Sequence, residues 1–289
     1  MTKMQKKNRE NVSWGNFYKA VFALVLPMAL QNLINVGVTA ADVVMLGKVG
    51  EKVLSGASLA GQIQYIMVLF LFGLTSGATV LTAQYWGKGD RDTIEKILAL
   101  GIKASICVTV FFTIAALTIP ELLMKIFTND PAVIAEGVRY LRIVAFSYVM
   151  MGITQVYLYT MRSVERVVIA TVVYLASLIC NIILNSIFIF GLLGVPAMGI
   201  RGAALATLIS RCLELFLVFL YAKFYNREIC FRLSYLLHTD RLLIKDFLIY
   251  SIPVVLNEVM WGFGTSAYTA ILGHLGSAAG AANSVGQVA

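Results

Sequence analysis

A few polar side chains lie inside long apolar stretches, where each is costly unless it has a partner or a function. Asp42 is the single charged residue between Ala20 and Gly47, and insertion scales disfavour an aspartate at mid-membrane by about 2.5–3.5 kcal/mol. Asn35 and Thr39 precede it by seven and three residues, so the three lie near one helix face. A carboxylate flanked by neutral oxygens can bind and exchange a cation, which makes Asp42 the first candidate functional residue. In the alternative interpretation, Asp42 only reaches water at the end of a tilted helix.

Three further polar positions could join such a site. Asn181 and Asn185 are four residues apart in the run LICNIILNSIFIF and share a helix face. They either bind a ligand or hydrogen bond to a neighbouring helix, a common use of asparagine in membranes. Glu258 lies near the middle of another apolar segment, where a carboxylate is again a functional candidate. Thr207 is a weaker candidate, because a threonine can hydrogen bond to its own backbone.

The composition requires a membrane environment for these residues. Of 289 residues, 59% are hydrophobic and 13% are charged, whereas a soluble domain has about 25% charged residues. The mean hydropathy is +0.82. The net charge of +8 is explained by basic cytoplasmic loops and does not require a nucleic-acid partner. The four cysteines are scattered singly and indicate neither disulfides nor a metal site.

Charged clusters divide the chain into seven apolar segments, and an eighth begins near residue 278. Such long segments cross a bilayer as helices, because backbone polar groups in lipid must be satisfied within the segment. With the N-terminus inside, sixteen basic residues lie on the cytoplasmic side and six outside, which predicts a multi-pass protein of the inner or plasma membrane with a cytoplasmic N-terminus. The expected spans are 17–46, 53–85, 94–119, 133–161, 164–192, 199–223 and 244–272.

An internal repeat predicts a two-lobed protein. With a one-residue gap, the stretch 22–62 aligns with 247–287, so that Pro27 matches Pro253 and Gln62 matches Gln287, and similarity at this distance indicates duplicated halves. We therefore expect an all-α, polytopic membrane helical bundle. Residues 1–230 form a six-helix N-lobe, and residues 231–289 form the interlobe linker, the seventh helix and the start of the eighth, which is an incomplete C-lobe. Each proline kinks its helix, either as static packing or as a hinge.

Sequence motifs for catalysis are absent. The segment WGKGD lacks the spacing of a phosphate-binding loop, no H-E-x-x-H occurs, and no aspartate pair in adjacent spans suggests an intramembrane protease. We therefore expect a protein that is not an enzyme, needs no cofactor and has no nucleic-acid partner.

Several stretches together resemble the multidrug and toxic compound extrusion (MATE) family of bacterial transporters. They are PMALQNLINVGVTAADVVMLGKVG, FGLTSGATVLTAQYWGKGD, YLRIVAFSYVMMGITQVYLYTMRSVERV and NIILNSIFIFGLLGVPAMGIRGAALAT. The resemblance implies a twelve-helix, two-lobed antiporter that expels cationic amphiphilic compounds in exchange for H+ or Na+. It also implies surrounding membrane lipids and a monomer at full length. The chain would then be truncated, since five of twelve helices are missing.

The resemblance also implies roles for individual residues. Asp42 corresponds to the aspartate that takes the coupling cation, H+ or Na+, in the N-lobe. A Na+ ion would be held by Asp42, Asn181 and Asn185, although several relatives have an aspartate at the last position. The remaining implied residues are Thr207, Tyr140 and Glu258 as cation or substrate ligands and Pro27 as the kink proline.

Two other functions stay open. A flippase of the same superfamily for lipid-linked precursors would need several basic residues in its cavity, for which Arg139, Arg142 and Arg211 are the candidates. Arg211 and Glu214 are more simply interpreted as a mutually neutralising pair one helical turn apart. A truncated lobe that transports nothing is the second alternative.

Overall fold

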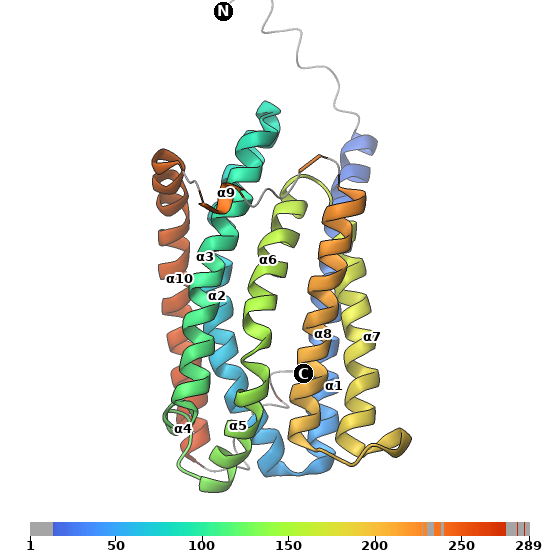
Figure 1. Ribbon diagram of the computed structural model, residues 1–289, viewed down its shortest axis with the longest axis vertical. Coiled ribbons are helices and arrows are strands. Elements are labelled where there is room, and N and C mark those ends of the chain that lie inside the picture. The colour runs from blue at the N-terminus through green and yellow to red at the C-terminus, as the bar shows by residue number, and fades with distance from the viewer. Residues whose placement is uncertain are drawn as a thin grey trace, which may run out of the picture.

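The computed structural model describes residues 14–226, 228–229, 234–237, 240–275, 282 and 286. These residues form a bundle of helices, and none of them lies in a strand (Figure 1). A 3-10 turn, Leu192–Gly194, follows α7, and a π-helical turn, Tyr221–Tyr225, follows α8. The helices are α1 (Trp14–Val49), α2 (Glu51–Lys88), α3 (Arg91–Thr118), α4 (Pro120–Lys125), α5 (Pro131–Val144), α6 (Ser147–Ser163), α7 (Val168–Phe190), α8 (Ile200–Leu220), α9 (Ser234–Leu237) and α10 (Arg241–His274).

Length and composition identify the helices that can cross a membrane. In the described part of the chain, α1 from Val21 onward, α2, α3, α7 and α8 each qualify, and α5 with α6 adds a sixth span if the bent pair is counted as one. The expected all-α membrane bundle is thereby confirmed. The expected seventh helix is present as α10, but α10 is not among the helices that meet the same test. The expected eighth helix lies almost wholly outside the described residues.

The fourth expected span is not one straight helix. The axes of α5 and α6 differ by 56° across a short break. At this break the Thr113 hydroxyl of α3 donates to the Ala145 carbonyl (3.1 Å), and the Ser147 hydroxyl donates to the Val144 carbonyl (2.6 Å). Side-chain hydroxyls that bond to backbone carbonyls interrupt the helical ladder and bend the helix. The expected span over 133–161 is therefore a bent pair of helices, which passes the length and composition test as one span.

The helix connections gather at the two ends of the bundle (Figure 1). The start of α1, the α2–α3 turn, the α6–α7 turn and the start of α10 lie at one end. The α1–α2, α4–α5 and α7–α8 connections lie at the other. Most described basic residues belong to the first end, as the topology prediction requires. Which end faces the cytoplasm stays a prediction.

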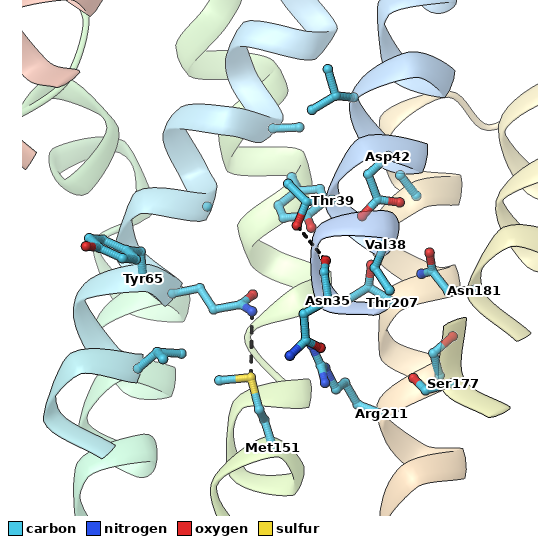
Figure 2. A pocket seen from close by; sticks show the side chains of 18 of the residues that line it. Asn35, Val38, Thr39, Asp42, Tyr65, Met151, Ser177, Asn181, Thr207 and Arg211 are labelled. Carbon is cyan, nitrogen blue, oxygen red and sulfur yellow. Dashed lines mark hydrogen bonds between the residues drawn. The ribbon is translucent and has the colours of Figure 1, made fainter. Parts of the chain in front are cut away.

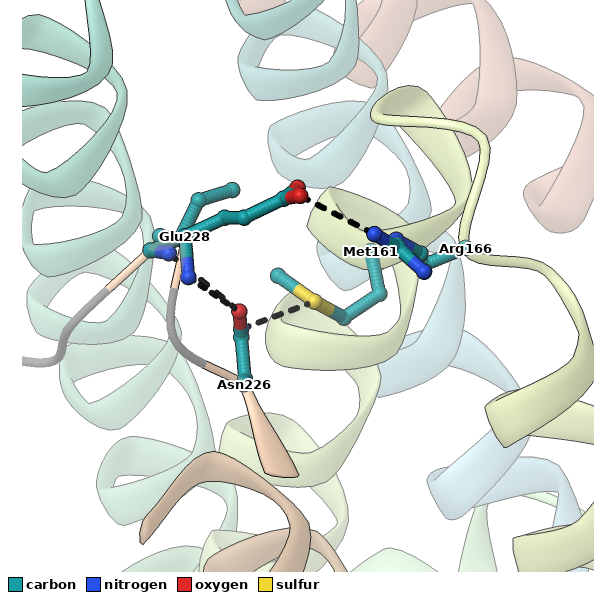
Figure 3. Close-up of polar contacts among 5 residues, drawn as sticks. Met161, Arg166, Asn226 and Glu228 are labelled. Carbon is teal, nitrogen blue, oxygen red and sulfur yellow. Dashed lines mark hydrogen bonds and ion pairs between the residues drawn. The ribbon is translucent and has the colours of Figure 1, made fainter. Parts of the chain in front are cut away.

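The segment after α8 is fastened to the first end of the bundle (Figure 3). The Asn226 amide donates to the Tyr157 hydroxyl (3.0 Å) and to the Met161 sulfur (3.3 Å), while its carbonyl oxygen accepts from the Glu228 backbone N–H (3.2 Å). Arg166, in the α6–α7 turn, forms an ion pair with Glu228 at 3.0 Å. The beginning of the connection between α8 and α10 is thus held against α6.

The buried core lies mainly between α2, α3, α5 and α6. Met67, Leu71, Leu141 and Tyr148 are all fully buried there. α1 is peripheral, because only 11% of the residues in its most apolar stretch are buried. Its most extensive contact is with α7. The first helix, which carries Asp42, is therefore held to the bundle chiefly by the helix that carries Asn181 and Asn185.

α10 packs tightly along α2 through glycines. A Cβ atom at Gly73 would lie 2.6 Å from Val255 Cα, and one at Gly77 would lie 2.9 Å from Ser251 Cβ. Small residues four apart allow two membrane helices to approach closely. This contact places α10 at the edge of the bundle, where it packs mainly against α2 (Figure 1).

Replacing Gly73 by leucine is expected to separate α10 from α2. The added side chain overlaps the α10 backbone, which cannot move away without losing the whole contact, and overpacking of this kind costs about 1–3 kcal/mol. The melting temperature of the purified protein in detergent should fall. Gly87→Ala in the same helix is the matched control, because no atom lies within 4 Å of its added Cβ. An equal melting temperature for Gly73→Leu and the control would contradict the close contact.

Candidate functional site

A cavity of about 620 Å³ lies between α1, α2, α6, α7 and α8, with one residue contributed by α5. Its volume falls within the range of about 300–1,000 Å³ that is usual for small-molecule sites. The wall combines apolar groups with amides, hydroxyls and charges, several of which are seen in Figure 2. Four tyrosines line it: Tyr65, Tyr140, Tyr159 and Tyr174.

Asp42 lines the cavity from α1 and contacts α7 through a hydrogen bond with Asn185. The Asn185 side-chain N–H group donates to Asp42 Oδ1 (2.5 Å) and to Asn181 Oδ1 (3.0 Å). An amide nitrogen has two protons to donate, so Asn185 satisfies both oxygens at once. Asn185 is fully buried and Asn181 is 3% exposed. The structure therefore brings together the three residues that were predicted to hold a cation.

Oxygen atoms dominate this group of residues. Besides the Asp42 carboxylate and Asn181 Oδ1, the buried Asn185 Oδ1 has no hydrogen-bond partner among the described residues. Neutral and charged oxygens are the ligands preferred by hard cations. In the described part of the chain, no group of three histidine, cysteine, aspartate or glutamate residues is arranged to hold a metal ion. Asp42, Asn181 and Asn185 together offer oxygen ligands from α1 and α7.

Tyr140 and Thr207 line the same cavity from α5 and α8. Asn35 and Thr39 line it from α1, which places the polar face expected from their spacing towards the cavity. Figure 2 shows Thr39, Thr207 and Asp42 in the same part of the wall. These residues surround Asp42 with neutral polar groups.

Glu258 lies apart from this cavity. It is half-buried on α10, which contacts α2 and α3, and no residue of α10 lines the cavity. Its proposed part in cation or substrate binding stays a prediction. Pro27 and Pro253 lie within α1 and α10, and both helices continue through them. A hinge at either proline is likewise still a prediction.

Arg211 and Glu214 form the predicted ion pair. Arg211 Nη1 donates to both carboxylate oxygens of Glu214, at 2.7 and 2.9 Å. Arg211 also lines the cavity, the place in which the flippase alternative required a basic residue. A signal for this was available, because Arg211 follows Thr207 by four residues and therefore shares its helix face.

Sequence reasoning also missed a hydrogen-bond network beside Pro27. The buried Gln31 accepts a hydrogen bond from Arg162 Nη2, and its amide donates to the Thr171 hydroxyl (2.9 Å) and the Val167 carbonyl (3.2 Å). Thr171 in turn donates to the Pro27 carbonyl (3.3 Å). The signal was an amide four residues after a proline in an apolar helix. The network ties α1 to the end of α6 and the start of α7.

Gln31→Leu is expected to destabilise this end of the bundle. Thr171 and Arg162 would lose a partner in a buried setting, and unsatisfied groups of this kind cost about 1–3 kcal/mol, more when charged. The melting temperature in detergent measures the loss. Asn32→Leu is the matched control, since Asn32 is the neighbouring amide and is exposed. Equal stability of both variants would show that the network contributes nothing.

Comparison with known proteins gives the family. The MatE family model matches residues 27–187. The probable multidrug resistance protein NorM of Agrobacterium fabrum is 26% identical over 221 residues, covering 73% of this chain and 45% of that protein. NorM of Thermotoga maritima is 29% identical over 194 residues, covering 67% and 42%. The chain spans about half the length of the curated relatives it matches.

Solved structures show the same fold. The MATE multidrug transporter DinF-BH superposes with a TM-score of 0.82 at 19% identity, over 93% of this chain and 60% of that one. An outward-facing MATE family transporter of the MOP superfamily gives 0.74 at 21% identity, over 83% and 52%. The family match covers more than half of the chain and includes most of α1 and most of α7. These two helices carry Asp42, Asn181 and Asn185. The chain belongs to the MatE family, as its sequence motifs predicted.

Proposed function

We propose that this chain forms the cation-binding lobe of a secondary active multidrug exporter, which exchanges cationic amphiphilic compounds for H+ or Na+. One observation carries the proposal. Asp42, in an otherwise uncharged apolar helix, lines a cavity large enough for a small molecule and is hydrogen bonded to Asn185. A carboxylate in such a place is costly unless it has a function. The family membership and the names of the NorM relatives support the same function.

Exchange follows from the charge of Asp42. The ionised carboxylate attracts a cationic compound into the cavity, and a proton or Na+ that neutralises it removes this attraction. Binding of the compound and of the coupling ion then exclude each other. In transporters built from repeats, rocking of one lobe against the other exposes such a site alternately to the two sides. Entry of the ion from one side therefore drives release of the compound there.

The two coupling ions make different demands on the site. A proton needs only the Asp42 carboxylate. A Na+ ion would also use the oxygens of Asn181 and Asn185, and the unpartnered Asn185 Oδ1 is available for it. Either ion fits the residues present, so the choice between them is made by experiment.

A flippase for pyrophosphate-linked lipids is less well supported. Such a substrate needs several cations in the cavity. Among the described lining residues Arg211 is the one cation, and it is paired with Glu214. Arg139 is exposed and paired with Glu136 instead.

The purified chain reconstituted in proteoliposomes tests the proposal. A fluorescent cationic dye should bind, and H+ or Na+ should displace the bound dye. Dye binding that neither ion weakens would contradict the proposed exchange. Absence of dye binding would contradict the cation site itself.

A further inference from the structure

Arg211 gives the cavity a second charged group of opposite sign to Asp42. Its Nη1 makes both hydrogen bonds to Glu214, whereas Nη2 and Nε have no partner among the described residues. The Arg211 side chain is 23% exposed, while that of Glu214 is 2% exposed. A guanidinium has five N–H donors in a planar fork. Arg211 therefore keeps donors available to a ligand in the cavity, while Glu214 fixes its orientation.

Ser210 adds a second donor to the same stretch of wall. It precedes Arg211 in α8, is 3% exposed and lines the cavity, and its hydroxyl has no hydrogen-bond partner among the described residues. Buried hydroxyls normally have a partner, so an unpartnered one in a cavity wall calls for a ligand or water. The guanidinium and the hydroxyl together could bind a carboxylate.

The two charged ends are separated along the cavity. Arg211 follows Thr207 by one helical turn, and Figure 2 shows Thr207 between the levels of Asp42 and Arg211. On α1, Asn35 and Asp42 are seven residues apart, which corresponds to about 10 Å along a helix. A ligand that reaches both ends must therefore carry its two charged groups several bonds apart.

We propose that Arg211 and Ser210 form an anion subsite, and that the cavity binds zwitterionic compounds whose ammonium group meets Asp42 and whose carboxylate meets Arg211. The inference rests on the proposed function, because Asp42 binds the positively charged group of the cationic compounds and of the zwitterionic compounds alike. Hydrogen bonds between guanidinium and carboxylate are charge-assisted and stronger than neutral ones. Glu214 neutralises much of the Arg211 charge, so the subsite strengthens binding without trapping the ligand.

Two dyes that differ by one group test this subsite. A rhodamine ethyl ester is a monocation, and its free acid carries the same cation together with a carboxylate. Equilibrium binding of both dyes is measured by fluorescence anisotropy on the purified full chain. The variant is the double substitution Arg211→Gln with Glu214→Gln, which removes the guanidinium without leaving a buried unpaired carboxylate. Glu214→Gln alone is the matched control, because it keeps Arg211 and an amide oxygen that still accepts from Arg211 Nη1 and holds its orientation.

The double variant should weaken binding of the free acid by about tenfold to a hundredfold, the range expected for a lost hydrogen bond between charged groups. Binding of the ester should stay within about twofold, and Glu214→Gln alone should keep binding of the free acid. Equal weakening of the binding of both dyes in the double variant, or unchanged binding of the free acid, would overturn the subsite.

Asp42→Asn tests the proposed function separately, since it should weaken the binding of both dyes. Unchanged ester binding in Asp42→Asn would overturn the cation site at Asp42. The difference between the two dyes in the Arg211 variant would still test the anion subsite.

Discussion

Asp42→Asn is expected to abolish coupled efflux of cationic compounds while leaving the fold intact. Asparagine keeps the shape of the side chain and an oxygen that accepts from Asn185, but it removes the charge that attracts the substrate. The interaction of two unit charges about 4 Å apart is worth about 4 kcal/mol near a protein surface, so the affinity for a cationic dye should fall by about tenfold to a thousandfold. Dye binding and efflux from cells that express the variant measure the effect.

Asp92→Asn is the matched control for this experiment. Asp92 lies in the first turn of α3, outside the cavity, and forms an ion pair with Lys96 at 2.6 Å. The control removes the same charge and should keep dye binding and efflux. Drug efflux at the wild-type level in Asp42→Asn, with normal amounts of protein in the membrane, would contradict the proposed role of the carboxylate.

Arg211→Gln alone is expected to destabilise the protein strongly. The substitution leaves Glu214, whose side chain is 2% exposed, without its partner. Breaking a buried ion pair by removing one member costs about 3–5 kcal/mol, because the remaining charge stays buried without compensation. Unfolding of the purified protein by heat or by denaturing detergent measures this loss.

The double substitution with Glu214→Gln should recover most of the lost stability. No unpaired charge remains in it, and replacing a whole buried pair is often neutral. Comparing the single and the double variant separates the contribution of Arg211 to stability, through its ion pair with Glu214, from its contribution to ligand binding in the cavity. A single variant as stable as the wild type would show that Glu214 is reached by water and that the pair is not a buried one.

Much of the site was predictable because its members share helix faces. The spacing of Asn35, Thr39 and Asp42 on one helix, and of Asn181 and Asn185 on another, predicts two polar faces in apolar surroundings. Such faces turn towards each other because lipid offers them no partners. In the structure, the side-chain nitrogen of Asn185 lies 2.5 Å from Asp42 Oδ1. Hydropathy likewise predicted the helical bundle, since long apolar segments in a membrane have few alternatives.

The features that sequence reasoning missed depend on which helices become neighbours. The break between α5 and α6 depends on Thr113 of α3, a residue 32 positions away from the carbonyl it bonds. The network at Gln31 joins residues more than 130 positions apart. The edge position of α10 follows from its packing against Gly73 and Gly77 of α2. Local periodicity carries no information on such pairings, so they emerge only when the helices are assembled.

Equilibrium binding of a cationic dye to the purified wild-type chain, measured across pH and Na+ concentration, tests the central claim most directly. If Asp42 serves substrate and coupling ion in turn, acidification or added Na+ must weaken dye binding competitively, so that the apparent Kd rises linearly with the ion concentration while the number of dye sites stays the same. Asp42→Asn should lose this dependence. A dye affinity that changes with neither ion would contradict the account.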